Sequence, residues 1–379
     1  MGAVPQLRFS DFEGEWKTER FSNLFSIGSG RDYKHLKTGK VPVYGTGGLM
    51  TYVNEWLYDG ESVGIGRKGT IDKPVFLVGK FWTVDTLFFT HSFNGILPKF
   101  LFAIFQRENW KKHNEASGVP SLSKATIESI KVKLPAEEEQ KKIAEFLGAV
   151  DEKIRLLQSR HEQLTLYKKG VMQKIFTQTL RFKADDGSDF PDWETTKLGD
   201  IATFSKGKGI AKADIIEDGK TECIRYGQLY TDYNETIDRV ISRTNVNIEE
   251  LILSDGNEVI IPASGETQID IATASCVVRK GIALGGDLNI VKSKQNGVFL
   301  SYYLNSAKKI EIARLSQGIS VVHIYASQLA NLSVNIPALE EQQKIADFLS
   351  AIDNKIEAVS AKVEDIQSFK KGLLQQMFV

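Results

Sequence analysis

The sequence has little of several features that mark other classes of protein. It contains only 2 cysteines among 379 residues, Cys223 and Cys276, which are too few for a disulfide framework or a four-ligand zinc site. No stretch approaches the roughly 18 consecutive apolar residues of a membrane span, and the first residues lack the charged-then-apolar pattern of a secretory signal. We therefore expect a protein of the reducing cytoplasm with no membrane contact.

Recognisable catalytic motifs are missing as well. The chain has no GxxxxGK[ST] phosphate loop, no HExxH and no GxSxG. The sequence GIGRKG from Gly64 resembles a dinucleotide-binding fingerprint, but neither a helix pattern nor an acid for a ribose follows it. Five histidines are scattered without the spacing of metal ligands: His35, His91, His113, His161 and His323. We expect no catalytic residue, no bound cofactor and no metal, although the missing motifs leave open a nuclease that binds its metal through carboxylates.

The chain also has no net charge, because 48 lysines and arginines balance 48 acidic residues. The balance differs locally. Residues 1–135 carry 18 lysines and arginines against 13 acidic residues, whereas residues 181–337 carry 17 against 21. Binding to a nucleic acid would therefore depend on local basic patches, or on a partner that supplies some of the phosphate contacts.

What the sequence does contain is a long internal repeat. Residues 134–176 align without a gap with residues 336–378, and 20 of the 43 positions are identical. Both copies place apolar residues at the 4-3-4-3 spacing of a coiled coil: Ile143, Leu147, Val150, Ile154 and Leu157, then Ile345, Leu349, Ile352, Ile356 and Val359. Each copy predicts one helix about 60 Å long.

Chain connectivity decides how two such helices can pair. A parallel pair would require the intervening segment to carry the chain back over the whole length of a helix, whereas an antiparallel pair needs no return. We therefore expect an antiparallel coiled coil with a pseudo-two-fold axis. Polar residues at core positions, namely His161, Lys168 and Lys370, would fix its register, and His161 is expected to be partly exposed.

Aromatic residues also repeat beside the apolar stripe, at Phe146 and Tyr167 in one copy and Phe348 and Phe369 in the other. They widen the stripe to the face of a helix in a bundle. A partner helix could pack there, or the rings could touch domains of the same chain. The residues expected to form the coiled coil and to contact partners are Phe146, Leu147, Val150, Ile154, Phe348, Leu349, Ile352 and Ile356.

The segments outside the helices are duplicated more faintly. Trp16 and Gly30 align with Trp193 and Gly207, and VPVYGTGG at Val41 aligns with the context of ECIRYGQLY. Short β-rich runs such as SVGIG, PVFLVG and TLFFT, or NEVIIPA, TASCVV and LNIVKS, alternate with one or two helices. The predicted fold is α+β: two α/β domains of shared fold, each with a twisted and barrel-like sheet, separated by an antiparallel coiled coil of two long helices.

Glycine-rich loops carry the residues that could bind DNA. GRKGT, from Gly66 to Thr70, follows a strand and offers an arginine for guanine and a lysine for phosphate. The corresponding loop of the second domain, ASGET, offers Glu266 for cytosine. Both loops could also be plain solvated turns. The candidate DNA contacts are Tyr44, Gly45, Thr46, Arg67, Lys68, Gly69, Thr70, Lys206, Lys208, Arg225, Tyr226, Gln228, Ser264, Gly265, Glu266 and Thr267.

The repeated pattern LPxxxEQxKIAxFLxxxDxKI with a trailing KKGxxQxxF, placed after each of two diverged domains, resembles the specificity (S) subunit of type I restriction-modification systems. The resemblance covers essentially the whole chain. It implies target recognition domains at residues 1–135 and 178–337, and conserved spacer helices at 136–177 and 338–379. It implies that each recognition domain reads one half of an asymmetric, bipartite DNA target.

The resemblance also implies partners. The helices would set the gap between the half-sites and dock two methyltransferase (M) subunits, with restriction (R) subunits joining to cleave unmodified DNA. S-adenosylmethionine, ATP and magnesium are then expected on those partners and not on this chain. Two alternatives remain: a non-catalytic coiled-coil scaffold that joins two protein-binding domains, and a self-contained nuclease or methylase.

Overall fold

The computed structural model describes residues 4–318 and 321–379 and divides into two compact units. Unit 1 comprises the chain up to Ser159 together with Val359–Val379, and unit 2 comprises Arg160–Ala358. Each unit therefore contains one predicted domain and a segment of both long helices. The first three residues of the first predicted domain, and residues 319–320 of the second, lie outside the described residues.

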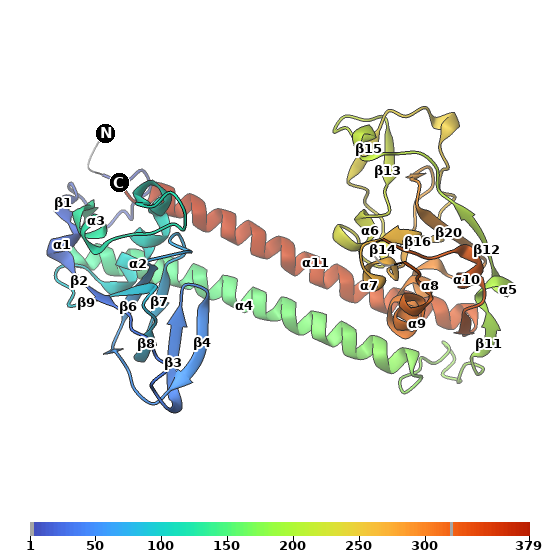
Figure 1. The fold of residues 1–379 in the computed structure, drawn as a ribbon, viewed down its shortest axis with the longest axis horizontal. Coiled ribbons are helices and arrows are strands. Elements are labelled where there is room, and N and C mark those ends of the chain that lie inside the picture. The colour runs from blue at the N-terminus through green and yellow to red at the C-terminus, as the bar shows by residue number, and fades with distance from the viewer. Residues whose placement is uncertain (1–3, 319–320) are drawn as a thin grey trace. The chain divides into compact units, whose positions relative to one another are not determined.

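The two long helices are α4 (Glu137–Phe176) and α11 (Leu339–Gln376), as Figure 1 shows. In unit 1, one core contains residues from the start of α4 and from the end of α11 and the chain after it: Ile143, Leu147, Leu373 and Met377. In unit 2 the roles are exchanged, and the core contains Val171, Ile175, Ile345 and Leu349. The start of one helix thus lies beside the end of the other in each unit, which confirms the predicted antiparallel pairing.

Unit 1 is built around two four-stranded sheets, ordered β2-β9-β6-β7 and β4-β3-β8-β5. Its strands are β1 (Lys17–Arg20), β2 (Ser26–Ser29), β3 (Thr38–Gly45), β4 (Gly48–Val53), β5 (Tyr58–Asp59), β6 (Ser62–Gly66), β7 (Val75–Leu77), β8 (Lys80–Thr83), β9 (Leu87–His91) and β10 (Lys131–Leu134). Its shorter helices are α1 (Phe21–Leu24), α2 (Pro98–Arg107), the 3-10 turn Trp110–His113 and α3 (Lys124–Ser129). Helix α2 begins with a proline, which suits the first turn because its missing N–H would have no partner there.

Unit 2 has a five-stranded sheet, β12-β20-β16-β18-β14, and a three-stranded sheet, β15-β13-β19. Its strands are β11 (Glu194–Lys197), β12 (Ala202–Lys206), β13 (Thr221–Ile224), β14 (Thr236–Ile237), β15 (Ser242–Thr244), β16 (Glu258–Pro262), β17 (Ser264–Gly265), β18 (Ser275–Val277), β19 (Ala283–Leu284), β20 (Leu288–Ser293), β21 (Val322–His323) and β22 (Ser333–Ile336). Its helices are α5 (Leu198–Ile201), α6 (Gln228–Thr231), α7 (Gln268–Ile271), α8 (Gly297–Tyr303), a π-helical turn at Leu304–Lys308, α9 (Lys309–Leu315) and α10 (Ala326–Ala330), with 3-10 turns at Lys212–Asp214 and Ile248–Glu250.

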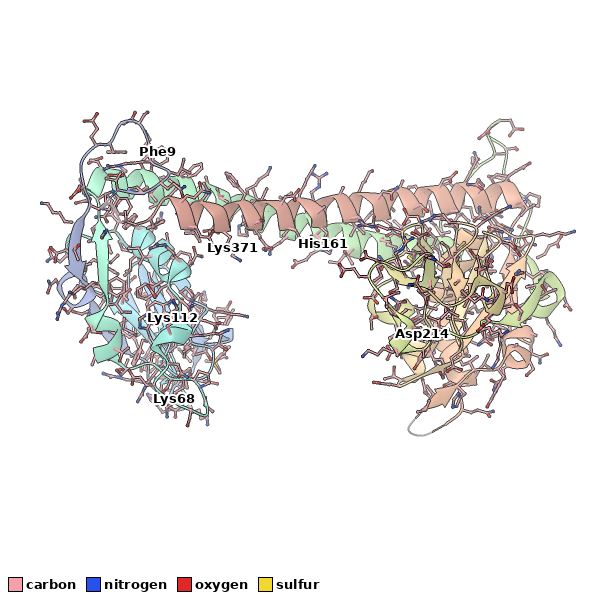
Figure 2. All side chains as sticks on the ribbon, turned by 90° about the horizontal axis from the view of Figure 1, so that it is seen from above. Phe9, Lys68, Lys112, His161, Asp214 and Lys371 are labelled. Carbon is pink, nitrogen blue, oxygen red and sulfur yellow. The ribbon has the colours of Figure 1, made fainter. Side chains whose placement is uncertain are left out.

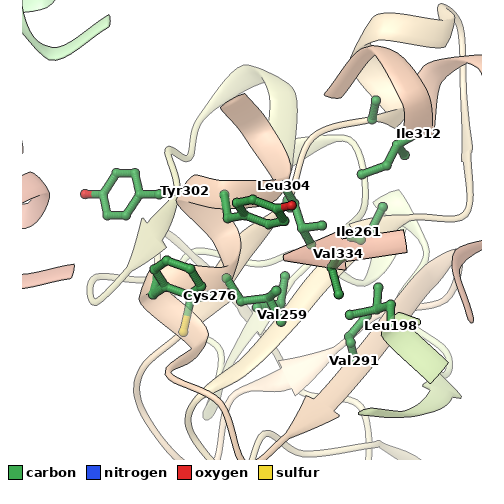
Figure 3. Packing of buried hydrophobic residues seen from close by; sticks show 14 of the residues in the cluster. Leu198, Val259, Ile261, Cys276, Val291, Tyr302, Leu304, Ile312 and Val334 are labelled. Atoms are coloured by element: carbon green, nitrogen blue, oxygen red, sulfur yellow. The ribbon is translucent and has the colours of Figure 1, made fainter. Parts of the chain in front are cut away.

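The predicted α+β class is therefore confirmed, but each domain has two main sheets and not one barrel-like sheet. Figure 3 shows the core of unit 2, where Val259, Ile261 and Val291 of the larger sheet pack against Leu304 and Ile312. These side chains alternate along β16 and β20, so one face of that sheet is covered by helices. The other face of the same strands contributes to a second core with Ile260 and Ile290. Because both faces are buried, the residues of β16 after Glu258, from Val259 to Pro262, are all apolar.

The repeated Glu-Gln pair in the first turn of each long helix anchors that helix to its domain. In unit 1 the guanidinium of Arg8 donates to both carboxylate oxygens of Glu139, at 2.8 and 2.7 Å. In unit 2 Arg181 donates to Glu341 in the same way, at 3.2 and 2.8 Å. Both glutamates are buried, so each bidentate pair compensates a carboxylate that has lost its water.

The following glutamine closes the same junction. Gln140 Oε1 accepts from the backbone N–H of Leu97, at 3.0 Å, and Gln342 Oε1 accepts from that of Asn296, at 2.9 Å. Both glutamines are buried. The Glu-Gln repeat is therefore explained by the attachment of a domain to the first turn of a helix.

The lysines predicted to fix the helix register are each paired with a carboxylate of the other helix. Lys370 lies 2.5 Å from Asp151 in unit 1, and Lys168 lies 2.7 Å from Asp353 in unit 2. Lys168 also contacts Glu235, at 2.8 Å. Burial opposes the charge of Lys168, but the two carboxylates outweigh it and raise the pKa of the amine. His161 is partly exposed, as expected.

Candidate nucleic-acid interface

A tight turn organises the candidate DNA-contacting loops of unit 1. We call the segment Thr83–Leu87, which joins β8 to β9, the hub turn of unit 1. Its backbone bonds three other segments: Thr83 O accepts from Arg31 N at 2.8 Å, Val84 N donates to Tyr44 O at 3.0 Å, and Thr86 O accepts from Arg67 N at 2.7 Å. The turn thus brings together three stretches that are far apart in sequence.

Unit 2 contains the same arrangement around Leu284–Leu288, its own hub turn. Leu284 O accepts from Lys208 N at 3.0 Å, Gly285 N donates to Ile224 O at 2.9 Å, and Asp287 O accepts from Ala263 N at 2.7 Å. The backbone bonds correspond one by one to those of unit 1. They define which positions of the two domains are equivalent.

These bonds correct two alignments made from the sequence. Arg67 is equivalent to Ala263, so the loop Arg67–Thr70 corresponds to residues 263–266, one position earlier than the sequence alignment placed it. Tyr44 is equivalent to Ile224 and not to Tyr226. A shared threonine in the first place and a shared Tyr-Gly pair in the second attracted the sequence match, although the backbone hydrogen bonds follow a different register.

The loop Arg67–Thr70 of unit 1 is held against a second segment. Arg67 O accepts from Leu122 N at 2.9 Å, Gly69 N donates to Pro120 O at 2.9 Å, and Lys68 forms a β-bridge with Ser121. Gly69 has φ of +85°, which an amino acid with a side chain adopts only with strain. Figure 2 shows Lys68 at the end of unit 1 remote from the long helices.

A cationic pocket of about 400 Å³ lies at this junction. It is lined by Ser29, Arg67, Lys68, Phe88, Glu115, Ser121, Leu122, Ser123 and Lys124. The Arg67 guanidinium and the Lys124 ammonium each lie 5.9 Å from the centre of the buried Phe88 ring. Lys124 also donates to the Ile27 carbonyl, at 2.6 Å, which fixes its position.

The pocket carries positive charge that the protein does not neutralise. Within residues 4–318 and 321–379, Arg67, Lys68 and Lys124 take part in no ion pair. The Glu115 carboxylate accepts from the hydroxyls of Thr126 and Ser123, which lower its pKa. Burial and then the Lys124 charge lower the pKa of His91, which shows that the cation is felt beyond the pocket. The arrangement suits an anion such as a DNA phosphate.

The matched site of unit 2 has different chemistry. Ala263 stands in place of Arg67, and Asn289 stands in place of Phe88, because each pairs with the equivalent residue of the neighbouring strand. Asn289 is fully buried, and its Nδ2 donates to the Ile324 carbonyl at 3.0 Å. Its Oδ1 has no partner within the described part of the chain. The same framework therefore presents cations in one unit and an amide in the other.

Several predicted residues of unit 2 already have structural tasks. Thr267 caps α7, accepting from Asp270 N at 3.1 Å. Gln228 accepts from Arg225 N at 2.9 Å and donates to Ser242 at 2.8 Å, so both ends of its amide are occupied. Ser264 and Gly265 are buried in the strand that pairs with β21.

The remaining predicted positions lie on accessible loops. Lys206, Lys208 and Glu266 are exposed, and Arg225 and Tyr226 are half-buried. In unit 1, Tyr44 and Thr46 are half-buried, at the turn between β3 and β4, and Gly45 is buried beneath Met50.

Sequence reasoning missed two cations beside the hub turn of unit 1. No motif marks Lys124 in the sequence, because only the folding of the chain brings it to the pocket that Arg67 lines. Arg31 could have been found, since the alignment of Gly30 with Gly207 already places it opposite the candidate Lys208. Arg31 opens a largely exposed basic segment, RDYKHLKTGK, that the sequence-based candidates did not include.

The aromatic residues of the long helices divide into two pairs. Phe146 meets Phe9 edge to face, with ring centres 5.8 Å apart, and Phe348 meets Phe182 at 5.5 Å. For these two rings the structure shows the second interpretation, contact with the same chain, because the segment that precedes each domain folds back onto the helix. Tyr167 and Phe369 are 52% and 55% exposed. The predicted seam residues Leu147, Ile154, Leu349 and Ile352 are buried, and Val150 and Ile356 are half-buried.

Two further features are absent from the described residues. No helix in that part of the chain is long and apolar enough to cross a membrane. No group of three or more histidine, cysteine, aspartate or glutamate side chains there could hold a metal ion.

Comparison with known proteins gives consistent matches over most of the chain. The family model described as "Type I restriction modification DNA specificity domain" matches residues 13–166 and 191–368. The MjaVIII specificity subunit of a type I restriction enzyme from Methanocaldococcus jannaschii is 29% identical over 337 residues, which cover 84% of this chain and 76% of the relative.

Solved structures match the fold at low sequence identity. The S subunit of a type I restriction-modification system from M. genitalium superposes with a TM-score of 0.68 at 15% identity, over 99% of both chains. A chain from a study of complex assembly and conformational transition of a type I restriction-modification system gives a TM-score of 0.54 at 14% identity, over 96% of this chain and 97% of that one.

Proposed function

Because the chain belongs to the family of type I restriction-modification DNA specificity subunits, we propose that it reads a bipartite, asymmetric sequence in double-stranded DNA. The recognition domain of unit 1 reads one half-site and that of unit 2 reads the other. The observation that carries this proposal is the pair of hub turns: equivalent backbone frameworks that display different side chains. A conserved framework with diverged loops is what two different half-sites require.

In unit 1 the loop Arg67–Thr70 and the cationic pocket make the contacts. The Arg67 side chain suits a guanine edge in the major groove, which presents two acceptors to a guanidinium. Lys68 and Lys124 suit backbone phosphates, since an ammonium binds phosphate as a point charge. Tyr44, which is bonded to the same hub turn, and Thr46 two residues further along the chain add further contacts.

In unit 2 the contacts come from Lys206, Lys208 and Arg225 on one side of the hub turn, and from Glu266 on the other. Glu266 suits the exocyclic amine of cytosine. The segment as a whole carries 17 lysines and arginines against 21 acidic residues, whereas the first domain has a positive excess. Binding by this domain therefore depends more on phosphate contacts that a partner supplies.

The partners are two methyltransferase subunits and, for cleavage, restriction subunits, which act in the cytoplasm. One of the similar solved structures comes from work on complex assembly in a type I system. The exposed Tyr167 and Phe369, at equivalent positions of the two long helices, offer matched surfaces for two copies of one partner. S-adenosylmethionine, ATP and magnesium would be bound by these subunits, so this chain reads DNA and leaves the chemistry to them.

The test is to co-express the chain with its neighbouring methyltransferase in a host free of DNA methylation and to map the modified bases. A two-part motif with a fixed gap is expected. Arg67→Ala should relax the sequence requirement in one half of the motif only. Ile310→Ala serves as the matched control, because that side chain is 56% exposed and remote from both hub turns in sequence. Modification without any sequence preference would refute the proposal.

A further inference from the structure

Helices α2 and α8 occupy equivalent places in the two units. Each begins after a backbone N–H that donates to the buried glutamine of a long helix, Leu97 to Gln140 and Asn296 to Gln342. Counting from those residues, Ala103 of α2 is equivalent to Tyr302 of α8. The long helices are related by the sequence repeat, so Asp151 is equivalent to Asp353, and Gly148 to Ser350.

In unit 2 the Tyr302 side chain fills the space between α8 and α11. It is fully buried, and its hydroxyl donates to Asp353 Oδ2 at 2.5 Å. Lys168 lies 5.1 Å from the centre of the ring and pairs with the other oxygen of Asp353. In Figure 3 the Tyr302 hydroxyl points away from the apolar cluster. The Tyr302 ring therefore packs among apolar side chains, its hydroxyl donates to the Asp353 carboxylate, and the Lys168 ammonium lies nearby.

In unit 1 the equivalent surface has no such side chain, because Ala103 stands there instead. A cavity of about 300 Å³ remains, within the range of about 300–1,000 Å³ that is usual for small-molecule sites. It is lined by Phe76, Lys99, Phe102, Ala103, Gln106, Ala144, Leu147, Gly148 and Asp151. The Phe76 and Phe102 rings, 5.5 Å apart, form one aromatic wall.

The polar end of the cavity also matches that of unit 2. Lys370 pairs with Asp151 Oδ1 at 2.5 Å and donates to Gln106 at 2.8 Å. The second oxygen of Asp151 accepts no hydrogen bond from the described residues, whereas its equivalent in unit 2 accepts the phenol of Tyr302. Unit 1 thus keeps the acceptor and the ammonium of a phenol site while lacking the phenol.

We propose that this cavity of unit 1 receives a tyrosine side chain of a partner protein, whose hydroxyl donates to Asp151. The apolar lining and the carboxylate would repel a phosphate, so DNA does not fit. The identity of the partner rests on the proposed function, which makes the methyltransferase subunit the expected source. Docking through this cavity is then confined to unit 1, because the chain's own Tyr302 already occupies the equivalent place in unit 2.

The first test uses 4-methylphenol, which has the chemistry of a tyrosine side chain, with toluene as the comparison. Binding to the full chain is measured by ligand-observed NMR. We expect 4-methylphenol to bind about tenfold more tightly than toluene, because a hydrogen bond to a charged acceptor contributes at least that factor. Asp151→Ala should abolish this preference. Failure of the wild-type chain to bind 4-methylphenol, or an unchanged preference in Asp151→Ala, would overturn the proposal.

Two blocking variants test the location of the site. Ala103→Tyr supplies the missing phenol from the chain itself. Gly148→Leu fills the cavity from α4, where an added Cβ would meet no atom within 4 Å, so the helix backbone need not move to admit the larger residue. Gly170→Leu, equally open but in unit 2, is the control. Both blocking variants should lose 4-methylphenol binding and the control should keep it; binding that survives in Gly148→Leu places the site elsewhere.

A reciprocal variant and the partner complete the test. Tyr302→Ala should create a second binding site for 4-methylphenol, in unit 2. Assembly with the co-expressed methyltransferase, measured by size-exclusion chromatography, should weaken at least tenfold in Gly148→Leu. If assembly is unchanged, the cavity is not a docking site, even when methylation shows that the proposed function holds. If 4-methylphenol binds as expected but no methylation occurs, the proposed function fails separately.

Discussion

The two units build the same backbone framework and use it differently. In both, a hub turn bonds three separate segments through corresponding hydrogen bonds. At equivalent points unit 1 presents Arg67 over Phe88, whereas unit 2 presents Ala263 beside Asn289. After duplication, then, backbone hydrogen bonds were kept and the side chains around them diverged, which is how one framework can serve two specificities.

The side chains that attach each long helix to its domain also differ between the two units, although less than the loops around the hub turns do. Glu341 accepts from Arg181 and, at 3.1 Å, from the indole of Trp193. In unit 1 Glu139 accepts from Arg8, but the indole N–H of Trp16 has no partner within the described residues. In unit 2 the buried glutamate therefore has two side-chain partners, an arginine and an indole, whereas in unit 1 it has the arginine alone.

The largest expected effect comes from removing the carboxylate of Glu341. Glu341→Ala removes the bidentate partner of Arg181 and leaves the indole of Trp193 unpaired, so it should lower the free energy of unfolding of unit 2 by about 3 kcal/mol. Glu139→Ala should lower that of unit 1 by about 1 kcal/mol less, since no indole hydrogen bond is lost. Urea denaturation followed by hydrogen exchange of each unit measures both. Equal losses would show that the indole bond contributes nothing.

A smaller effect is expected at Tyr302. Tyr302→Phe keeps the ring but removes the hydrogen bond to Asp353 Oδ2, so the free energy of unfolding of unit 2 should fall by about 1.5–3 kcal/mol. Ala103→Phe, at the equivalent position of unit 1, is the control, because no such hydrogen bond exists there. Urea denaturation measures both variants. An unchanged free energy of unfolding in Tyr302→Phe would mean that water replaces the hydroxyl at no loss.

The next effect in size concerns DNA binding and should separate the roles of two cations of unit 1. Lys124→Gln removes one phosphate contact, so the slope of log Kd against log salt concentration should fall by about 0.9. The loss should be similar for all sequences, whereas Arg67→Ala should reduce discrimination at one base pair by about 1–3 kcal/mol. Fluorescence anisotropy of the complex with methyltransferase on variant duplexes measures both. A loss of base discrimination in Lys124→Gln would reverse the two roles.

The smallest expected effect is a response to alkaline pH that is confined to unit 2. Burial raises the pKa of Cys276 from 9.0 to about 12 and that of Cys223 to about 11. Both thiols stay protonated in the folded chain after they ionise in the unfolded chain. Stability is therefore complete below pH 9 and falls as the pH rises toward 12, on the order of 1 kcal/mol per pH unit for each thiol.

Hydrogen exchange at pH 8 and pH 10.5 would locate that loss. Within the described chain, every cysteine or tyrosine whose pKa is raised belongs to unit 2: Cys223, Tyr230, Tyr233, Cys276, Tyr302 and Tyr303. Cys276→Ala should flatten the pH dependence in part. An equal loss of protection in unit 1 would contradict the assignment.

The sequence predicted the long helices well, because a repeat of 20 identities and a heptad spacing depend only on local pattern. The runs SVGIG and LNIVKS were found for the same reason and form β6 and β20. The register between the two domains was harder. Shared letters suggested that Tyr44 matches Tyr226, whereas the hydrogen bonds to the hub turns match it with Ile224.

The candidate site was predicted in part. Arg67 and Lys68 lie at the cationic pocket, as a strand-loop pattern rich in glycine suggested. Lys124 could not be predicted, because it meets Arg67 only after α3 packs beside β9. Thr267 has a helix-capping role that the sequence also allowed: a threonine three residues before an aspartate tends to cap a helix, and its hydroxyl then accepts from the backbone.

The buried lysines at the two extremities of the helix pair have a mechanical consequence. Sliding one helix along the other by a single heptad would carry Lys168 and Lys370 away from their carboxylates together and leave two largely buried ammonium groups unpaired. Such a slip would cost free energy at both Lys–Asp pairs, so the two helices have one favoured alignment. A helix pair held in this way can change its alignment only when residues are inserted or deleted.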